Sequence, residues 1–427
     1  MPSIATLQDQ LDRVAALAKT DRTRELDEFI TQLRTHFSDH AESLKSLAFL
    51  LNQNDRFGDA VSVAKQGLAL DPLHPLLHHN AARALGMLGN VAESLVHSRE
   101  AVRLLPDNPY MHFHLAGTLL GLGKLDEGWQ HYRWFYDLPG MDRQLVRLNF
   151  PQWRGESLSG RTFLLVGEQG RGDEIQFIRF AEWLHRQGAI VDVLVSQPIA
   201  GIAASIAGVR AVFTTVPPGA YDYWSHMLKM PEHMKLNQSM LPIATRYITA
   251  SPDKLAYWRA HVDALPTRPA HAKTRRMGVV WAGGPHHVLD RFRSIRLDAL
   301  KPLFALPGTS WYSVQKGDRE CDSEALADEF DLHTLGPAIQ DFTDTLAILE
   351  TLDLLITVDT SVAHLAGAAG RPVWVLLPTC ADWRWMVDRT DTPWYPSMRL
   401  FRQRELGQWD EVIEEVRNAL REWQAAR

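Results

Sequence analysis

The sequence has few cysteines, no long apolar run and no excess of basic residues. Its 427 residues include two cysteines, Cys321 and Cys380, which exclude a disulfide framework and show no metal-ligand spacing. No apolar run approaches the about 18 residues that a membrane-spanning helix needs. Lys and Arg number 45 against 51 Asp and Glu, a net charge of −6. This balance excludes a large basic surface, so we expect no nucleic-acid partner.

Two further absences concern the N-terminal third. The segment Met1–Ala5 is followed by an acidic residue at position 9 and shows no signal-peptide pattern, so we expect a cytoplasmic protein. None of the 14 tryptophans precedes Trp129. Because the length suggests roughly two to four domains, this asymmetry predicts two differently built parts.

A regular repeat runs through the first part of the chain. Alanines recur at Ala48, Ala82 and Ala116, and the small residues Ala60, Ser94 and Gly128 recur where two helices would approach closely. This constant spacing predicts stacked helix–turn–helix units over residues 41–140. Apolar residues one period upstream predict a degenerate fourth unit that caps the stack: Val14, Leu17, Leu26, Ile30 and Leu33.

This pattern resembles the tetratricopeptide repeat, and we assign residues 1–140 to a helical array of that kind. The resemblance implies a concave surface for a protein partner or for a second copy of the chain. The alternative is a spacer or dimerisation arm. Six histidines suggest a metal site, but without carboxylate or Cys partners we interpret them as solvated or packing residues: His74, His78, His79, His97, His112 and His114.

After a linker at 141–160, short apolar runs alternate with helical stretches, which predicts a fold of βαβ units. We expect one Rossmann-like domain at 161–265 and a second at 275–427. The expected strands are Thr162–Val166, Ala189–Val195, Ala211–Thr214, Tyr221–Trp224, Met277–Trp281, Ser310–Val314, Leu354–Val358 and Val373–Leu377. The expected helices are Glu174–Arg186, Leu297–Ala305, Phe342–Thr351, Ser361–Ala369 and Gln408–Trp423.

The loop after the first expected strand is rich in glycine and ends at Asp173. Its residues Glu168, Gln169 and Gly170 stand where backbone amides at a helix N-terminus would meet an anion or a sugar. The spacing is not that of the dinucleotide fingerprint. Asp173 is positioned either to cap the helix or to act as a general base, and the two roles are compatible.

Two loops of the second half follow expected strands. The first contains Trp281, Gly283 and Gly284, followed by Arg291, Arg293 and Ser294, and the second carries Lys316. These basic residues could neutralise a phosphate. The alternative is an ordinary glycine turn with solvated cations.

The strongest motif joins the strand Leu354–Val358 to a helix of small residues. Asp359, Thr360 and Ser361 stand at the start of that helix, where hydroxyls, amides and the helix dipole favour a diphosphate. His364 follows within the helix and would touch phosphate or pack inside. Asp341 begins the preceding helix, and Trp383 follows the next strand, where it would flank a base or belong to the core.

The run from about Gly167 to the C-terminus resembles two-Rossmann-domain glycosyltransferases, called GT-B. It is most similar to heptosyltransferase-like proteins fused to tetratricopeptide repeats, and its architecture also resembles that of the O-linked N-acetylglucosamine transferases. The resemblance rests on seven motifs: Asp359–Ala366, Gly172-Asp173, Gly167–Gly170, Arg293–Ile295, Gln315–Gly317, Asp341-Phe342 and Asp382–Trp385.

The resemblance implies inverting transfer of a sugar from a nucleotide-sugar to an acceptor hydroxyl, without a metal or another cofactor. Asp173 would be the base, and Glu168, Gln169 and Gly170 would lie on the acceptor side. The implied donor site comprises Trp281, Gly283, Gly284, Arg291, Arg293, Ser294, Lys316, Asp341, Asp359, Thr360, Ser361, His364 and Trp383.

Two departures from the family pattern keep an alternative open. Val362 stands where heptosyltransferases usually have Gly, and Leu289 stands where the repeat-fused subgroup is expected to have Asn. They support an inactive scaffold for protein–protein interaction. A third interpretation keeps the enzyme but makes lipopolysaccharide or another glycan the acceptor.

Overall fold

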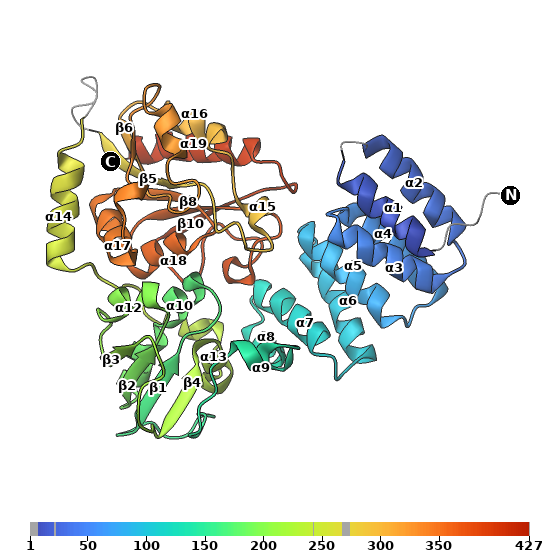
Figure 1. Ribbon diagram of the computed structural model, residues 1–427, viewed down its shortest axis with the longest axis horizontal. Helices are drawn as coiled ribbons and strands as arrows, with labels where there is room; N and C mark the ends of the chain where they lie inside the picture. Colours follow the sequence, from blue (N-terminus) through green and yellow to red (C-terminus); the bar gives the residue numbers. More distant parts are fainter. Residues whose placement is uncertain (1–6, 21–22, 242, 267–273, 427) are drawn as a thin grey trace. The chain divides into compact units, whose positions relative to one another are not determined.

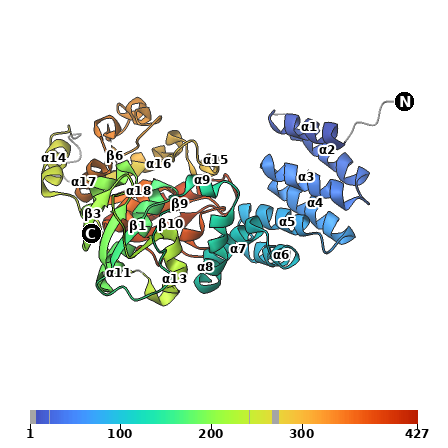
Figure 2. The ribbon, with the colours of Figure 1, turned by 60° about the horizontal axis from the view of Figure 1, so that its bottom comes forward.

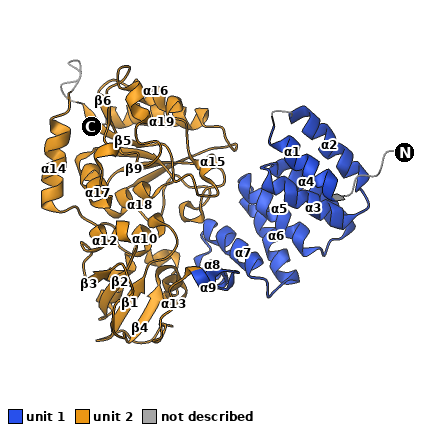
Figure 3. Ribbon diagram, in the orientation of Figure 1, with its two compact units in different colours: residues 1–143 blue, residues 144–427 orange. Residues whose placement is uncertain are grey.

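The computed structural model describes residues 7–20, 23–241, 243–266 and 274–426. The chain divides into two compact units, residues 1–143 and 144–427 (Figure 3). Helices alone form the secondary structure described for unit 1, whereas unit 2 contains two parallel sheets.

Unit 1 is a row of antiparallel helix pairs in chain order (Figure 2). Its helices are α1 (Leu7–Ala18), α2 (Thr23–His36), α3 (Ala41–Gln53), α4 (Phe57–Leu70), α5 (Pro75–Met87), α6 (Val91–Leu104), α7 (Pro109–Gly121) and α8 (Leu125–Tyr132). The 3₁₀ turn η1 (Arg133–Asp137) and the short helix α9 (Met141–Gln144) follow. The predicted helical array is confirmed, including the pair α1–α2 upstream of the three repeats.

The turns between paired helices need a left-handed backbone at equivalent positions. Asp55, Gly89 and Gly123 have φ values of 62°, 82° and 72°, which glycine adopts at little cost. The small residues also act as predicted, since a Cβ on Gly128 would lie 2.6 Å from the Leu120 side chain. The sequence period therefore reflects one backbone geometry that recurs in each repeat.

The histidines of unit 1 pack in repeated pairs. His78 Nδ1 lies 2.9 Å from His97 Nδ1, and the equivalent atoms of His112 and His131, one repeat further on, lie 2.7 Å apart. The other ring nitrogens of His78 and His112 reach the carbonyls of Pro72 and Pro106. One expectation is wrong: His74 has a carboxylate partner, because its Nε2 lies 3.0 Å from Glu42 Oε1.

The first sheet of unit 2 has the strand order β3-β2-β1-β4, and all its strands are parallel. The strands are β1 (Thr162–Val166), β2 (Ile190–Leu194), β3 (Val209–Phe213) and β4 (Tyr223–His226). The helices of this lobe are α10 (Arg171–Phe177), α11 (Phe180–Arg186), α12 (Gln197–Ala203) and α13 (Met230–Met234), with 3₁₀ turns at Met227–Lys229 and Gln238–Met240. We call this part the N lobe.

The second sheet has the parallel order β10-β9-β8-β5-β6-β7. Strands β5, β6, β8 and β10 of this sheet are labelled in Figure 1. Its strands are β5 (Arg275–Val280), β6 (Thr309–Ser313), β7 (Leu332–Thr334), β8 (Leu354–Val358), β9 (Val373–Leu377) and β10 (Met398–Arg402). The helices are α14 (Pro252–Asp263), α15 (Asp290–Arg293), α16 (Lys301–Phe304), α17 (Phe342–Thr351), α18 (Ser361–Ala368) and α19 (Asp410–Ala425). Turns of 3₁₀ helix lie at Leu297–Leu300, Asp322–Leu326, Gly336–Ala338 and Trp383–Trp385. We call α14 together with the part from β5 onward the C lobe.

Read from β7, the six strands follow the order 3-2-1-4-5-6 of a Rossmann sheet, and the N lobe shows the first four positions of that order. The predicted fold class, an α-solenoid followed by the two Rossmann-like lobes of a GT-B fold, is confirmed. In such sheets a ligand binds beyond the carboxyl ends of the strands, where the order reverses. The strand order reverses between β1 and β4 in the N lobe and between β5 and β8 in the C lobe.

The predicted single helix Glu174–Arg186 is wrong, because the structure breaks it into α10 and α11. Side chains satisfy the carbonyls near the break. The Tyr247 hydroxyl donates to the Ile175 carbonyl (2.9 Å), and Arg179 Nε donates to the Gln176 carbonyl (2.7 Å). Strands β7 and β10 were also not predicted.

Candidate functional site

The β1–α10 loop places Asp173 in the first turn of α10. The Gly170 amide donates to Asp173 Oδ2 (2.8 Å), so this carboxylate caps the helix as predicted. Gln169 adopts a φ of 61°, and Gln169 and Gly170 are exposed. One oxygen of Asp173 is thereby fixed by the loop, and the other is directed elsewhere.

That second oxygen pairs with a residue of the C lobe. Asp173 Oδ1 forms an ion pair with Arg384 Nη2, while Arg384 Nη1 donates to Asp382 Oδ1 (2.8 Å). Arg384 is 6% exposed, and its guanidinium lies 4.2 Å from the centre of a Trp383 ring. The candidate base and the loop after β9 therefore meet through one buried guanidinium.

The loop after β8 contributes Asp359 and Thr360. Burial, followed by the negative charge of Asp382, raises the pKa of Asp359 to about 6. The Thr360 hydroxyl lies 3.3 Å from Thr357 Oγ1, and the Thr360 side chain does not cap α18. Ser361 begins α18 and is partly buried.

His364 packs inside the interface between α10 and α18. Its Nδ1 lies 3.0 Å from the Tyr395 hydroxyl, and its ring stacks on Trp385 with centres 5.0 Å apart. Burial lowers the pKa of His364 well below its usual value, so the ring is neutral. A Cβ on Gly172 would lie 3.0 Å from His364 Cδ2, which explains why glycine precedes Asp173.

Hydrogen bonds and an ion pair connect residues within the loop after β5. The Gly283 amide donates to Ser294 Oγ, and that hydroxyl donates to Asp290 Oδ1, both at 3.0 Å. Arg293 Nε pairs with the same carboxylate oxygen at 3.3 Å. Gly284 is exposed. A Cβ on Gly283 would lie 2.5 Å from both Arg293 and Asp290, so the close approach needs glycine.

Trp281 is buried, and the amides of Trp281 and Ala282 both donate to Gln315 Oε1. The side chain of Gln315, from the end of β6, therefore holds the Trp281 segment in place. This packing puts Trp281 within the core of the C lobe.

Three of the predicted polar residues have partners away from Asp173. Lys316 Nζ pairs with Glu320 at 2.8 Å and donates to the Gly336 carbonyl at 3.0 Å. Arg291 is exposed and lies over the ring of Phe292. Asp341 caps α17 by accepting from the amides of Thr343 and Asp344.

Glu168, predicted to lie on the acceptor side, is buried in the N lobe. Its Oε1 accepts from the Leu228 amide at 2.7 Å, and its Oε2 lies 3.7 Å from His226 Nδ1. Burial lowers the pKa of His226 to about 4. Glu168 therefore joins the loop after β1 to the loop after β4.

Arg384 and Asp382 were not among the predicted site residues, although both lie in the motif that contains Trp383. The spacing Asp-x-Arg could have indicated them, because a carboxylate two residues away can orient a guanidinium. Their meeting with Asp173, which belongs to the other lobe and is distant in the sequence, is a result of the tertiary structure.

Arg179 was missed as well, and it joins the two lobes. It is fully buried, donates to the Trp394 carbonyl (2.9 Å) and the Tyr247 hydroxyl (3.1 Å), and lies 4.6 Å from the Tyr395 ring centre. The sequence offered no signal for it beyond an arginine within an apolar stretch.

Replacing Arg179 by Met is expected to lower the free energy of unfolding of unit 2 by about 2 to 3 kcal/mol, because buried carbonyl and hydroxyl oxygens lose their donor. Urea unfolding followed by tryptophan fluorescence measures this. The control is Arg186→Met, whose exposed side chain pairs with Glu182 on the surface; its effect should stay below about 0.5 kcal/mol. Equal effects of the two variants would contradict the prediction.

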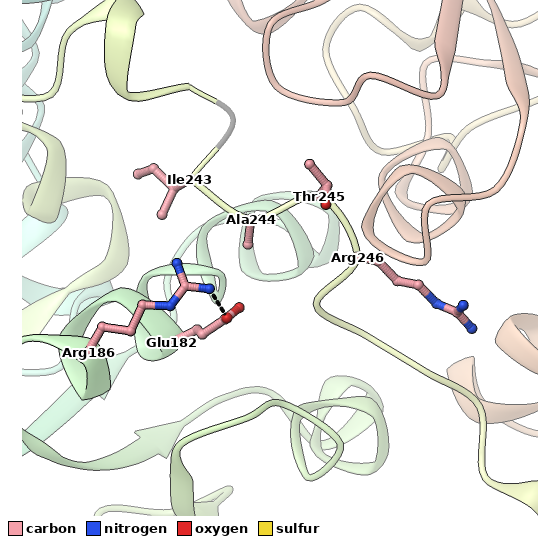
Figure 4. A pocket seen from close by; sticks show the side chains of 6 residues that line it. All are labelled: Glu182, Arg186, Ile243, Ala244, Thr245 and Arg246. Carbon is pink, nitrogen blue, oxygen red and sulfur yellow. Dashed lines mark hydrogen bonds and ion pairs between the residues drawn. The ribbon is translucent and has the colours of Figure 1, made fainter.

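A shallow cavity of about 190 Å³ lies elsewhere in unit 2, at α11 and residues 243–246 (Figure 4). Its lining is Glu182, Arg186, Ile243, Ala244, Thr245 and Arg246. In Figure 4 the Arg246 side chain points away from the Glu182–Arg186 pair. None of the predicted site residues lines this cavity.

Within the described ranges, no three His, Cys, Asp or Glu side chains are grouped so that they could hold a metal ion. No helix of that part of the chain is long and apolar enough to cross a membrane.

The fold and the site together define a helical-repeat protein with two Rossmann-like lobes of the GT-B type. No family model matches the chain. Protein FlbA of Caulobacter vibrioides is 23% identical over 459 residues, which cover 93% of this chain and 76% of FlbA.

Solved structures with similar folds include a family 9 glycosyl transferase from Veillonella parvula (10% identity, 59% of this chain and 88% of that one, TM-score 0.43). The ADP-heptose lipopolysaccharide heptosyltransferase II of E. coli has 14% identity, 62% and 99% coverage and a TM-score of 0.43. A variant O-GlcNAc transferase of Thermobaculum terrenum has 16% identity, 100% and 94% coverage and a TM-score of 0.30.

Proposed function

We propose that this chain is an inverting glycosyltransferase that moves a sugar from a nucleotide-sugar to an acceptor hydroxyl. The observation that carries the proposal is Asp173, placed at the reversal point of the N-lobe sheet and in contact with a guanidinium from the C lobe. The carboxylate can accept the proton of the acceptor hydroxyl, and the guanidinium can stabilise the negative charge of the leaving diphosphate.

In the proposed reaction, Asp173 takes the proton of the acceptor hydroxyl. The acceptor oxygen forms a bond to the anomeric carbon as the bond from that carbon to the diphosphate oxygen breaks. The diphosphate leaves with the bonding electrons, and its charge is stabilised by Arg384, by Arg293 and by the amides of Thr360 and Ser361. The anomeric configuration inverts because attack and departure occur on opposite faces. The proposal requires no metal and no cofactor.

The acceptor we favour is a protein bound by the repeats in unit 1, and a cytoplasmic location belongs to the same proposal. A glycan acceptor would leave the reaction at Asp173 unchanged. Intact-mass analysis of proteins co-expressed with the chain separates the two acceptors, since a protein acceptor gains the mass of one or more sugars.

The proposal predicts that the purified chain binds and turns over a nucleotide-sugar. The chain is incubated with uridine, adenosine, guanosine and cytidine diphosphate sugars, with thermal shift reporting binding and release of nucleoside diphosphate reporting turnover. We expect the sugars of one nucleotide class both to raise the unfolding temperature of the chain and to release nucleoside diphosphate. If none binds and none is hydrolysed, the proposal fails.

An inactive scaffold is the second candidate. The pairing of Lys316 with Glu320 and the exposed position of Arg291 favour it, because two expected phosphate ligands are turned to other partners. If Asp173→Asn leaves the biological phenotype intact while substitutions on the repeats abolish it, the scaffold is supported and the enzyme is not.

A further inference from the structure

Arg384 lies between two carboxylates that belong to different lobes. Asp382 is its neighbour in the turn Trp383–Trp385, where it also accepts the Arg384 backbone amide at 3.0 Å. Asp173 comes from α10 of the N lobe. One cation thus contacts two carboxylates.

The contact of Arg384 with Asp382 is supported by more interactions than its contact with Asp173. Asp382 binds both the backbone and Nη1 of Arg384, and Trp383 covers the face of the guanidinium. Asp173 holds Nη2 through its Oδ1 alone, and its Oδ2 is engaged with the Gly170 amide. Arg384 can therefore exchange the partner of Nη2 while Asp382 and Trp383 keep the guanidinium in place.

Two other cations of the C-lobe loops pair with carboxylates of their own lobe. Arg293 pairs with Asp290, and Lys316 pairs with Glu320. Arg384 differs from them because it engages the candidate base. A guanidinium also matches a phosphate well, since it donates two parallel hydrogen bonds.

We propose that Asp173 and the diphosphate of the donor compete for Arg384, so that donor binding releases Asp173 to act as the base. This inference rests on the proposed function. Before the donor binds, the ion pair holds Asp173 away from an acceptor hydroxyl. When the diphosphate takes Nη2, the carboxylate oxygen becomes free to accept a proton, and the donor must bind first.

The competition predicts an unusual result for Asp173→Asn. Removing the carboxylate removes the competitor, so a nucleoside diphosphate should bind the variant about 5- to 10-fold more tightly than it binds the unmodified chain. Arg384→Gln should weaken binding of the same nucleotide about 10-fold or more, the range of a charge-assisted hydrogen bond. The probe is whichever of UDP, ADP, GDP and CDP binds the unmodified chain, measured by calorimetry.

The double variant isolates the coupling between the two residues. In the Arg384→Gln background, Asp173→Asn should no longer improve nucleotide binding. Glu182→Gln, on α11 and paired with Arg186, removes a carboxylate away from Arg384 and should leave affinity unchanged. Thermal unfolding of every variant shows that the fold is retained.

Kinetics give a second measurement. Initial rates of the unmodified chain should follow a compulsory order with the donor first. If nucleotide binds but Asp173→Asn leaves its affinity unchanged or weaker, or if the gain persists without Arg384, the competition is overturned while the proposed function stands. If no nucleotide binds the unmodified chain, the proposed function itself fails.

Discussion

Asp173→Asn is expected to reduce sugar transfer by about 10³-fold, within the range of a lost general base. The amide oxygen can still accept the Gly170 amide, so α10 keeps its cap and the fold survives. Proton removal from the acceptor is lost, because an amide does not take up a proton near neutral pH. Transfer is measured as nucleoside diphosphate released in the presence of acceptor.

The matched control is Glu182→Gln, a carboxylate-to-amide change on the next helix of the same lobe. It should leave transfer within about twofold of the unmodified chain. If Asp173→Asn retains more than a tenth of the activity while binding nucleotide at least as tightly as the unmodified chain, Asp173 is not the base.

The second large effect concerns unit 1, which should lose stability in mild acid. Burial, followed by the charge of Arg83, lowers the pKa of His79 to about 4, and burial, followed by the charge of His79, lowers that of His114 to about 3. The two rings lie 5.2 Å apart, and His114 Nδ1 contacts the Ser98 hydroxyl. Protonating either ring would place a charge beside Arg83.

The lowered pKa values of both histidines make the stability of unit 1 decrease as the pH falls. Both rings are neutral in the folded unit, whereas the unfolded chain takes up protons near pH 6.5. Stability is therefore fully present above about pH 6.5 and falls as the pH drops towards the folded values. At pH 5 the loss should reach about 4 kcal/mol for the two rings together, at about 1.4 kcal/mol per unit of pKa shift.

Hydrogen exchange of the whole chain at pH 7 and pH 5, corrected for intrinsic rates, measures this loss in α5 to α8. His114→Gln cannot take up the proton and should flatten the response. His36→Gln, on the exposed surface of α2, should not change it. Equal protection at both pH values would contradict the prediction.

Much of the fold could be predicted from local pattern. Each helical repeat contains its own close approach between paired helices, which is why the sequence predicts a small residue at Gly128. The parallel strands β1, β8 and β9 are short buried apolar runs with the predicted limits. The two unpredicted strands lie at opposite edges of the C-lobe sheet, and β10 carries exposed Arg399 within it.

The candidate site was only partly predictable. The sequence by itself determined that Asp173 lies near the start of a helix after a glycine loop, because capping depends on residues three positions apart. It also determined which loops follow the carboxyl ends of the strands. Only the tertiary structure decided that Arg384, not Lys316 or Arg291, meets Asp173, and that Arg179 joins the lobes. The physical reason is that a long cationic side chain has several carboxylates within reach, and the packing of distant segments selects which one it pairs with.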